Sequence, residues 1–474
     1  MKILLIDPKR INLETYLILP NLGIGYNASA LRRAGHDVKI CNAARKNMLP
    51  EDVARTVAEE RYNLVGITIF TPYFSSAGMY AEALRRRVPE TILVAGGPHA
   101  IFEPEEIYER IPAFDYVVTG EGEETFPALV SLLESREEPG PADLEKIPNL
   151  CFRDGNGFRK TERSLIKDIK PLDPVAWDLL GPHKFGLHPN GIFTKKKKVA
   201  PMITSRGCPY PCKFCGAGLA MGRKIRHRDP ESILDDMQLL RDEYDIWEIQ
   251  MMDDNFIVDN RFAIDVCEGM IRRKLDMVWG CPPGIRVDCV TEEVISAMAA
   301  AGCYSTSLGI ESGSQRVLNL MKKKIDLDEV PRKLSIIRKH GIRVTGLFIL
   351  GFPGETTGEM EQTVALSLKL DLNRANFFTF TPFPGSVMYD ELKAMGKLDN
   401  LNYDDLYIHN LGYVDDSIDP DALDQVHKRA HFRFYLRPRI ILGILKEIHS
   451  LSQVQIILKR AMKVIFSKKK NRKC

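Results

Sequence analysis

The stretch TSRGCPYPCKFC, residues 204–215, places Cys208, Cys212 and Cys215 at the spacing C-x3-C-x2-C. Three thiolates this close together can bind three irons of a 4Fe-4S cluster, which takes four protein ligands when fully coordinated. The fourth iron is then open to a small ligand, and an open metal position is where catalysis can take place. This stretch therefore predicts an iron–sulfur site.

Zinc and disulfides are the alternative interpretations of the same cysteines. The other seven cysteines are isolated, and no CxxC pair or HxxxH partner lies nearby to complete a zinc tetrahedron. A chain of 474 residues does not need disulfides for its stability. The spacing therefore favours iron over both alternatives.

Residues 191–395, which include the cysteine loop, show six strand–helix units. The expected strands cover residues 199–203, 246–251, 280–287, 304–310, 344–350 and 375–381. Each is apolar on both faces, as in a parallel sheet. Six such units predict a partial (β/α)6 barrel of the TIM type, with its chemistry at the carboxyl ends of the strands. The cysteine loop directly follows the first strand, at that end.

Residues 1–135 also alternate between strands and helices. Strands are expected at 2–7, 38–42, 64–70, 91–96 and 116–119, which predicts an α/β, doubly wound parallel sheet of the Rossmann or flavodoxin type. Ligands bind such sheets beyond the carboxyl ends of the strands. Three loops lie there: Thr71-Pro72-Tyr73, Gly96-Gly97-Pro98-His99 and Gly120-Glu121-Gly122-Glu123.

The remaining segments connect and extend these two domains. Residues 136–190 are expected to form a linker with a small hairpin turning at 154–157. Residues 396–474 are expected to be helical and basic, with one helix over 425–449 interrupted at Pro438. From residue 425 onward, fourteen Lys and Arg accompany one acid, Glu447, although the whole chain carries only +3.

Composition places the chain in the soluble globular class, with 44% hydrophobic and 27% charged residues. The start, MKILLIDPKR, is too short and too soon interrupted for a signal peptide, and no apolar run reaches the length of a membrane span. We therefore expect a cytoplasmic protein, in a compartment that keeps thiols reduced.

Over residues 1–400 the chain resembles the radical S-adenosylmethionine (radical SAM) enzymes of the cobalamin-binding class. Besides the cysteine loop, the resemblance rests on DDNF at 253–256, GIESGS at 309–314, LGFPGET at 350–356 and TPFPGS at 381–386. It implies that the three cysteines ligate the cluster, and that SAM chelates the fourth iron through its amino and carboxylate groups. It also implies SAM contacts for Phe214, Asp253, Asp254, Arg286, Glu311, Gly351 and Pro353.

Some of these residues also have purely structural explanations. Asp253 and Asp254 are suited to capping a helix, and Glu311 to holding a neighbouring backbone.

For the first domain the resemblance implies cobalamin binding by Thr71, Pro72, Tyr73, Gly96, Gly97, His99, Gly120 and Glu121. No Asp-x-His-x-x-Gly motif follows the first strand, so no histidine is expected to coordinate cobalt from below. The alternatives are that His99 is an ordinary loop residue, and that the domain binds another nucleotide or nothing.

The implied reaction begins with reductive cleavage of SAM to a 5′-deoxyadenosyl radical, with the electron from an external flavodoxin- or ferredoxin-type donor. Methylation of an unactivated carbon is the leading expectation. An oxidative cyclisation similar to that of the anaerobic magnesium-protoporphyrin ester cyclase, and a non-catalytic corrinoid or iron–sulfur carrier, remain open. The sequence identifies no general acid, base or radical-quenching residue.

The basic carboxyl-terminal region bears on the substrate. Residues 451–466 have an amphipathic, lysine-rich pattern, followed by a basic tail at 467–474. This pattern predicts peripheral membrane contact and a hydrophobic substrate, such as an isoprenoid lipid, a hopanoid or a tetrapyrrole. Nucleic acid is not expected, because few aromatics interleave with the basic residues. A helix packed on the barrel with solvated lysines is the alternative.

Overall fold

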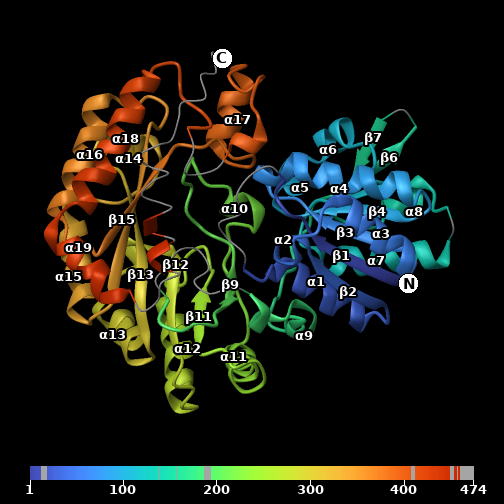
Figure 1. Cartoon of the computed structure of the whole chain (residues 1–474), viewed down its shortest axis with the longest axis horizontal. Coiled ribbons are helices and arrows are strands. Elements are labelled where there is room, and N and C mark those ends of the chain that lie inside the picture. Colours follow the sequence, from blue (N-terminus) through green and yellow to red (C-terminus); the bar gives the residue numbers. More distant parts are fainter. Residues whose placement is uncertain are drawn as a thin grey trace.

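The computed structural model describes residues 1–11, 19–136, 138–155, 157–185, 194–406, 411–448, 453–455 and 457–458. Two sheets, each carrying its own helices, stand beside one another, with the short helix α10 (Ala217–Ala220) between them (Figure 1). The fold class expected from the sequence is therefore confirmed. Most of the helix predicted over 451–466, and the whole tail at 467–474, lie outside the described residues.

The first sheet has the strand order β2-β1-β3-β4-β5-β6-β7. Strands β1 to β5 are parallel and have the bounds Lys2–Asp7, Asp37–Asn42, Leu64–Thr68, Ile92–Gly96 and Tyr116–Val118. Helices α1 (Leu22–Arg33) and α7 (Gly122–Ser135) share a core on one face, and α3 (Pro50–Glu60) and α4 (Phe74–Arg87) share a core on the other. The shorter helices are α2 (Ala43–Lys46), η1 (Thr71–Tyr73), α5 (Pro98–Phe102), α6 (Pro104–Arg110), α8 (Pro141–Leu144), α9 (Trp177–Leu180) and η2 (Pro182–Lys184).

The hairpin expected within residues 136–190 is present, and it belongs to this first sheet. Its strands, β6 (Leu150–Asp154) and β7 (Gly157–Lys160), add two antiparallel strands beside β5. Leu150, Cys151 and Phe152 are buried against the helices, so the hairpin completes the domain core. Sequence alone showed its turn but not its partner, because strand pairing is a long-range property.

The second sheet has the order β8-β11-β12-β13-β14-β15, with all pairs parallel. Its strands are Ala200–Met202, Glu248–Met251, Val278–Arg286, Cys303–Glu311, Arg343–Leu350 and Arg374–Thr379. The main helices covering its outer face are α11 (Pro230–Tyr244), α12 (Asn260–Arg272), α13 (Glu292–Ala300), α15 (Glu329–Lys339) and α16 (Thr357–Lys369). The described strands form an open, six-stranded arc, as predicted.

Shorter elements complete the barrel. The two-stranded pair β9 (Ser205–Arg206) and β10 (Arg226–His227) flanks the cysteine loop. The others are η4 (Val287–Cys289), α14 (Gln315–Leu320), α17 (Val387–Ala394) and η5 (Tyr403–Asp405).

The two faces of the last barrel strands differ in burial. We expected every strand to be apolar on both faces; β14 and β15 carry apolar side chains on both, but alternate between buried and half-buried residues. The buried set packs on the helices, whereas Leu347, Ile349 and Phe378 belong to the half-buried set. A partial barrel has this pattern because its concave face is not filled by a second layer of helices.

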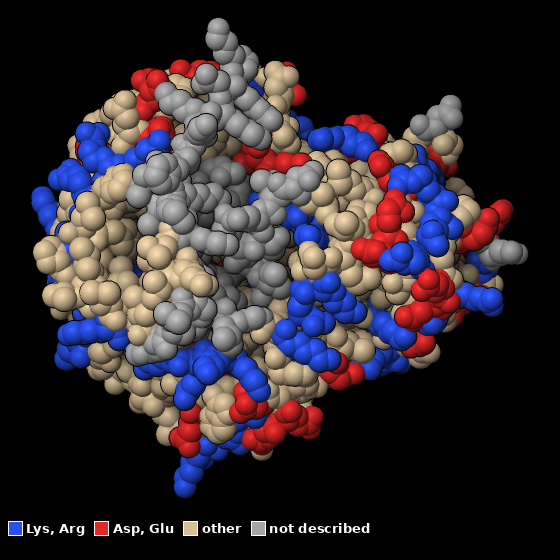
Figure 2. Space-filling view, in the orientation of Figure 1, with Lys and Arg blue, Asp and Glu red and all other residues tan. Residues whose placement is uncertain are grey.

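The carboxyl-terminal region contains α18 (Pro420–Tyr435) and α19 (Pro438–Glu447), so the predicted break at Pro438 is present. Leu423, Val426, Ala430, Phe434 and Ile440 bury one side of these helices in the barrel core. In Figure 2 the surface at the left, where Figure 1 places α19, is largely uncharged, with basic side chains at its margins. Among the described residues, no helix is long and apolar enough to cross a bilayer.

Candidate functional site

The cysteine loop is held to the barrel at several points. Gly207 has a φ of +99°, and a Cβ at that position would lie 2.5 Å from the carbonyl oxygen of Lys224, so only glycine fits the turn into the loop. The Cys208 amide donates to the Gly222 carbonyl at 3.0 Å. The Lys213 amide donates to the Met321 carbonyl at 2.9 Å. The backbone of the loop is therefore preorganised.

The three thiols are free and differ in their surroundings. Cys212 is buried, Cys208 is half-buried and Cys215 is exposed. Burial raises the pKa of the Cys208 thiol, and desolvation raises that of Cys215 to about 12. Cys215 is thus accessible yet poorly solvated, which is expected for a side chain inside a recess. Among the described residues, no three His, Cys, Asp or Glu side chains converge closely enough for a single metal ion.

Arg286, at the end of β12, lies directly against this loop. Its Nη1 is 3.5 Å from Cys212 Sγ, and its guanidinium lies 3.5 Å from the centre of the Tyr210 ring. It also donates to the carboxylate of Asp288 and to the carbonyl of Lys323. The predicted SAM contact for Arg286 stays a prediction, since these partners already occupy much of the guanidinium.

The two aspartates of the DDNF motif have different environments. Asp253 is buried, and its carboxylate accepts hydrogen bonds from the amides and hydroxyls of Thr204 and Ser205, at 2.5–3.2 Å. It therefore locks the carboxyl end of β11 to the start of the cysteine loop. Asp254 is exposed, and desolvation, followed by the charge of Asp253, raises its pKa to about 6. Of the two, Asp254 is the one available to a ligand.

Glu311 ends β13 in a strained conformation, with a φ of +66°. Its Oε1 accepts a 2.7 Å hydrogen bond from Lys323 Nζ, and both side chains are buried. A Cβ on Gly309 would lie within 3 Å of both groups, so this glycine leaves room for the pair. Lys323 also lies 5.8 Å from the centre of the Phe214 ring, which brings Glu311 and Phe214 into one neighbourhood.

The LGFPGET segment turns sharply at the end of β14. Gly351 has a φ of +77°, and its amide donates to Glu355 Oε2 at 2.7 Å. The Phe352 amide donates to the same oxygen at 3.1 Å, while Glu355 Oε1 is buried without a recorded partner. Pro353 is half-buried at this turn. Glu355 therefore shapes the backbone that carries Gly351 and Pro353.

In the first domain, Thr71 and His99 form a buried pair. The Thr71 hydroxyl is 3.2 Å from His99 Nδ1, and the imidazole packs against Phe74 and Tyr403. Burial lowers the pKa of His99 to about 4, so the ring is neutral. Its Nε2 is buried with no recorded partner. His99 thus packs in the core beneath the loop, and the half-buried Pro72 and Tyr73 are more accessible.

Gly96 and Gly97 are half-buried at the end of β4. Gly97 has a φ of +94°, and a Cβ there would lie 2.5 Å from Thr68 Oγ1. A Cβ on Gly96 would meet nothing nearer than 4.0 Å, which leaves open space beside it. The exposed Phe70 follows β3 at the same edge. Small residues beside an exposed aromatic fit a large planar ligand such as a corrin.

Both carboxylate oxygens of Glu121 take part in buried ion pairs. Its Oε1 accepts from Arg206 at 2.8 Å and its Oε2 from Arg226 at 2.7 Å, and Arg206 also bonds Glu123. Both arginines belong to the strands that flank the cysteine loop. Gly120, half-buried beside Glu121, is crowded by Asn149. Glu121 therefore joins the two domains, and both of its carboxylate oxygens are already occupied.

The domains also meet beside the last cysteine. A Cβ on Gly385, in the TPFPGS segment, would lie 2.2 Å from the ring of Phe102, and Gly216 contacts the same phenylalanine. Phe102 ends α5, directly after the loop that contains Gly97. The carboxyl-terminal ends of the strands in both sheets therefore face a shared region around Cys215. Sequence reasoning missed Phe102 and Lys323, because neither stands in a distinctive pattern, and it gave no role to Arg206, although Arg206 belongs to the stretch at 204–215.

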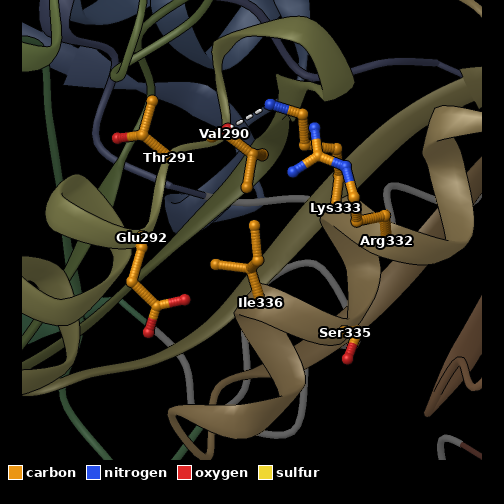
Figure 3. A pocket seen from close by; sticks show the side chains of 7 residues that line it. All are labelled: Val290, Thr291, Glu292, Arg332, Lys333, Ser335 and Ile336. Carbon is orange, nitrogen blue, oxygen red and sulfur yellow. Dashed lines mark hydrogen bonds between the residues drawn. The ribbon is translucent and has the colours of Figure 1, made fainter.

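The chain also has a recess away from these residues. It measures about 620 Å³ and lies between α13 and α15 on the helical layer, where Lys333 Nζ donates to the Val290 carbonyl at 2.6 Å (Figure 3). Its lining consists of Val290, Thr291, Glu292, Arg332, Lys333, Ser335 and Ile336. None of the predicted site residues lines it, so the cysteine loop remains the candidate site.

Comparison with known proteins identifies both domains. Residues 8–130 match the B12 binding domain family and residues 202–367 the radical SAM superfamily. The chain is 31% identical to the uncharacterized methyltransferase PH0819 of Pyrococcus horikoshii, over 94% of this chain and 93% of that protein. It is 25% identical to the anaerobic magnesium-protoporphyrin IX monomethyl ester cyclase of Rubrivivax gelatinosus, over 86% of this chain and 71% of that protein.

The fold is similar to a solved structure as well. Radical SAM methyltransferase TsrM from Kitasatospora setae, with cobalamin and a [4Fe-4S] cluster bound, matches with a TM-score of 0.69 and 18% identity, over 83% of this chain and 78% of that one. These matches confirm the expected cofactors, namely cobalamin, SAM and a 4Fe-4S cluster. The chain belongs to the cobalamin-binding radical SAM enzymes.

Proposed function

We propose that this enzyme methylates an unactivated carbon of a hydrophobic substrate, in the region where the two domains meet. The observation that carries the proposal is the position of the cysteine loop. It follows the first barrel strand and lies beside Phe102, at the strand ends of the B12-binding domain. When bound, the cluster with SAM supplies a 5′-deoxyadenosyl radical and methylcobalamin supplies the methyl group.

The chain's own residues bind and orient these groups. Cys208, Cys212 and Cys215 hold the cluster on a loop fixed by Asp253 and by the backbone of Met321. Asp254, whose carboxylate is accessible, and Glu311, which is strained at the end of β13, bind SAM. Phe214, Gly351 and Pro353 shape its adenine side. Thr71, Pro72, Tyr73, Gly96, Gly97 and Gly120 shape the cobalamin side.

Replacing a cluster ligand tests this assignment. Cys212→Ala is expected to lower the iron content after anaerobic reconstitution and to abolish formation of 5′-deoxyadenosine from SAM. Cys267→Ala, which changes a buried cysteine on α12, is the matched control and should retain both. A Cys212→Ala enzyme that still cleaved SAM would rule out the assignment.

The concave face of the barrel supports a hydrophobic substrate. Leu347, Ile349 and Phe378 are half-buried there, where a filled core would cover them completely. Isoprenoid lipids, hopanoids and tetrapyrroles share the required apolar surface. Oxidative cyclisation is the second candidate, because the related cyclase of Rubrivivax gelatinosus acts on a protoporphyrin ester. Methylation forms S-adenosylhomocysteine together with 5′-deoxyadenosine, whereas cyclisation forms no stoichiometric S-adenosylhomocysteine.

The surface of α18 and α19 supports contact with a membrane that stores such a substrate. Leu436, Leu442 and Leu445 are 66%, 59% and 57% exposed, and Phe432 and Ile441 are also exposed. Arg433, Arg439 and Lys446 lie exposed among them. Exposed apolar side chains with basic neighbours are typical of helices that lie on anionic bilayers.

Liposome pelleting tests the membrane contact. Leu442→Glu/Leu445→Glu is expected to reduce pelleting with vesicles of anionic phospholipid, because it places charge on the apolar face. Met395→Glu, at an equally exposed position after α17, is the control. Deletion of residues 450–474 tests the contribution of the basic tail. Unchanged pelleting of both the double variant and the deletion would refute the proposed contact.

A further inference from the structure

Residues 209–211 form the outer face of the cysteine loop. Pro209 is exposed, and Tyr210 and Pro211 are half-buried, between two of the cysteines. Pro209 is bonded to Cys208, and Pro211 to Cys212. This face is therefore joined to two of the cluster ligands directly along the backbone, which is a short path for an electron.

A recess of about 380 Å³ lies against this face. Pro211, Asn319, Lys322 and Lys324 line it. The hydrogen bond from the Lys213 amide to the Met321 carbonyl ties the lysine-bearing segment to the cysteine loop. The recess and the loop therefore form one continuous surface.

The three lysines of the segment 322–324 alternate between exposed and buried positions. Lys322 and Lys324 have φ values of +51° and +54°, in the left-handed region that side chains seldom adopt. This geometry directs Lys323 inward to Glu311, while Lys322 and Lys324 are exposed.

The charge on this face is mainly positive. Arg223 and Lys224 are exposed on the other side of residues 209–211, and the Arg223 guanidinium donates to the Tyr210 carbonyl. No ion pair is recorded between Lys322 or Lys324 and any described carboxylate. The exposed acids nearby are Asp288, which pairs with the Arg286 guanidinium beside the Tyr210 ring, and Asp326 and Asp328, which follow along the chain. We define the basic rim as Arg223, Lys224, Lys322 and Lys324.

The opposite side of the loop is not open to a protein partner. There, Gly216 contacts Phe102, and Gly385 packs on the same ring, so the first domain covers the loop beside Cys215. Buried ion pairs from Arg206 and Arg226 to Glu121 close another side. Within the part of the chain that the structure describes, these contacts cover two sides of the loop and leave the outer face exposed.

We infer that the outer face and its basic rim are the docking surface for an acidic, one-electron carrier protein of the flavodoxin or ferredoxin class. The inference rests on the proposed function, because reductive SAM cleavage consumes one electron per turnover. The carrier loses one electron and the oxidised cluster gains it, so no further reactant is required. Opposite charges steer the two proteins together and orient them.

Charge reversal tests the surface. Lys322→Glu/Lys324→Glu is expected to raise the apparent KM for reduced flavodoxin by about tenfold or more, because the charge of the rim is reversed. With dithionite as reductant, the rate of 5′-deoxyadenosine formation should stay within about twofold of the unchanged protein, since a small anion does not need the docking surface. Lys274→Glu is the matched control, because Lys274 is also an exposed lysine in the left-handed region, with a φ of +51°.

Binding provides a second readout that does not depend on turnover. Calorimetric titration with oxidised flavodoxin should show affinity that falls with added salt, and loss of that affinity in the double variant but not in Lys274→Glu. Repeating the titration with oxidised ferredoxin tests the other carrier of the same class.

Activity and binding of the double variant with flavodoxin that match those of Lys274→Glu would overturn the inference. An equal loss with dithionite and flavodoxin would also overturn it, because the lysines would then support the site rather than docking. Absence of SAM cleavage by the unchanged enzyme with dithionite would instead refute the proposed function.

Discussion

At the scale of single residues, Arg286 is a side chain that lies against the cysteine loop. Arg286 is within 3.5 Å of the Cys212 sulfur, and its other nitrogens hold Asp288 and the Lys323 backbone. The motifs predicted that Arg286 lies at a strand end, and it does. They did not predict its bond to the Lys323 carbonyl, because that group belongs to a different loop 37 residues further along the chain.

Arg286 is expected to tune the cluster. Positive charge and hydrogen bonds near cluster sulfurs stabilise the reduced form, so removing them lowers the reduction potential. Arg286→Gln should therefore give a more negative midpoint in a redox titration followed by electron paramagnetic resonance, with Arg286→Lys in between. Arg332→Gln, at an exposed arginine on α15, should leave the midpoint unchanged. Equal midpoints for Arg286→Gln and the unchanged enzyme would contradict this role.

Asp7, at the end of β1, is expected to make stability depend on pH. Burial raises the pKa of its carboxyl from 3.8 to about 7, so between these values the folded state binds more protons than the unfolded state. The contribution of Asp7 to the free energy of unfolding therefore falls as pH rises from 4 to about 7, then levels off. Asp7→Asn should remove that part of the slope in urea titrations across this range, and identical slopes would contradict it.

At the scale of elements, the positions of the strands could be predicted from the sequence and their partners could not. Every predicted strand is present within about two residues, because apolar runs between turns mark buried parallel strands. The β9–β10 pair and helix α5 were missed because each is too short to show a period. Glu121 was correctly placed in a loop, whereas His99, expected in a loop, lies in α5, and ion pairing and burial in the folded chain set the environments of both.

The ion pairs that join β9 and β10 to the first domain are expected to hold the domains together. Removing one partner of a buried ion pair costs about 3–5 kcal/mol, because the remaining charges are left buried. Glu121→Gln, which leaves Arg226 without its carboxylate partner and Arg206 with Glu123 alone, should lower the free energy of unfolding by about this amount in urea titrations.

The exposed pair Arg261–Asp265 provides the control for that measurement. Asp265→Asn should change the free energy of unfolding by no more than about 0.5 kcal/mol, since exposed pairs contribute little. A change below about 1 kcal/mol in Glu121→Gln would show that the buried pairs do not stabilise the assembly of the two domains.

At the scale of the whole molecule, the two parallel sheets direct their carboxyl-terminal strand ends toward one region, next to Cys215 and Phe102 (Figure 1). Parallel sheets place ligands at these ends, so the fold alone brings two cofactor sites together. The sequence predicted both domains but not their meeting point. Contacts such as Phe102 with Gly385 join residues that are distant in the chain and carry no local signal.

The central claim is that this region couples SAM cleavage to methyl transfer. The most direct measurement quantifies 5′-deoxyadenosine and S-adenosylhomocysteine in anaerobic reactions of the enzyme loaded with cluster and cobalamin, given SAM, reductant and an isoprenoid lipid, a hopanoid or a tetrapyrrole. Methyl transfer predicts that both products form in equal amounts and that the substrate gains one methyl group. Formation of 5′-deoxyadenosine without S-adenosylhomocysteine, or of neither product, would contradict the claim.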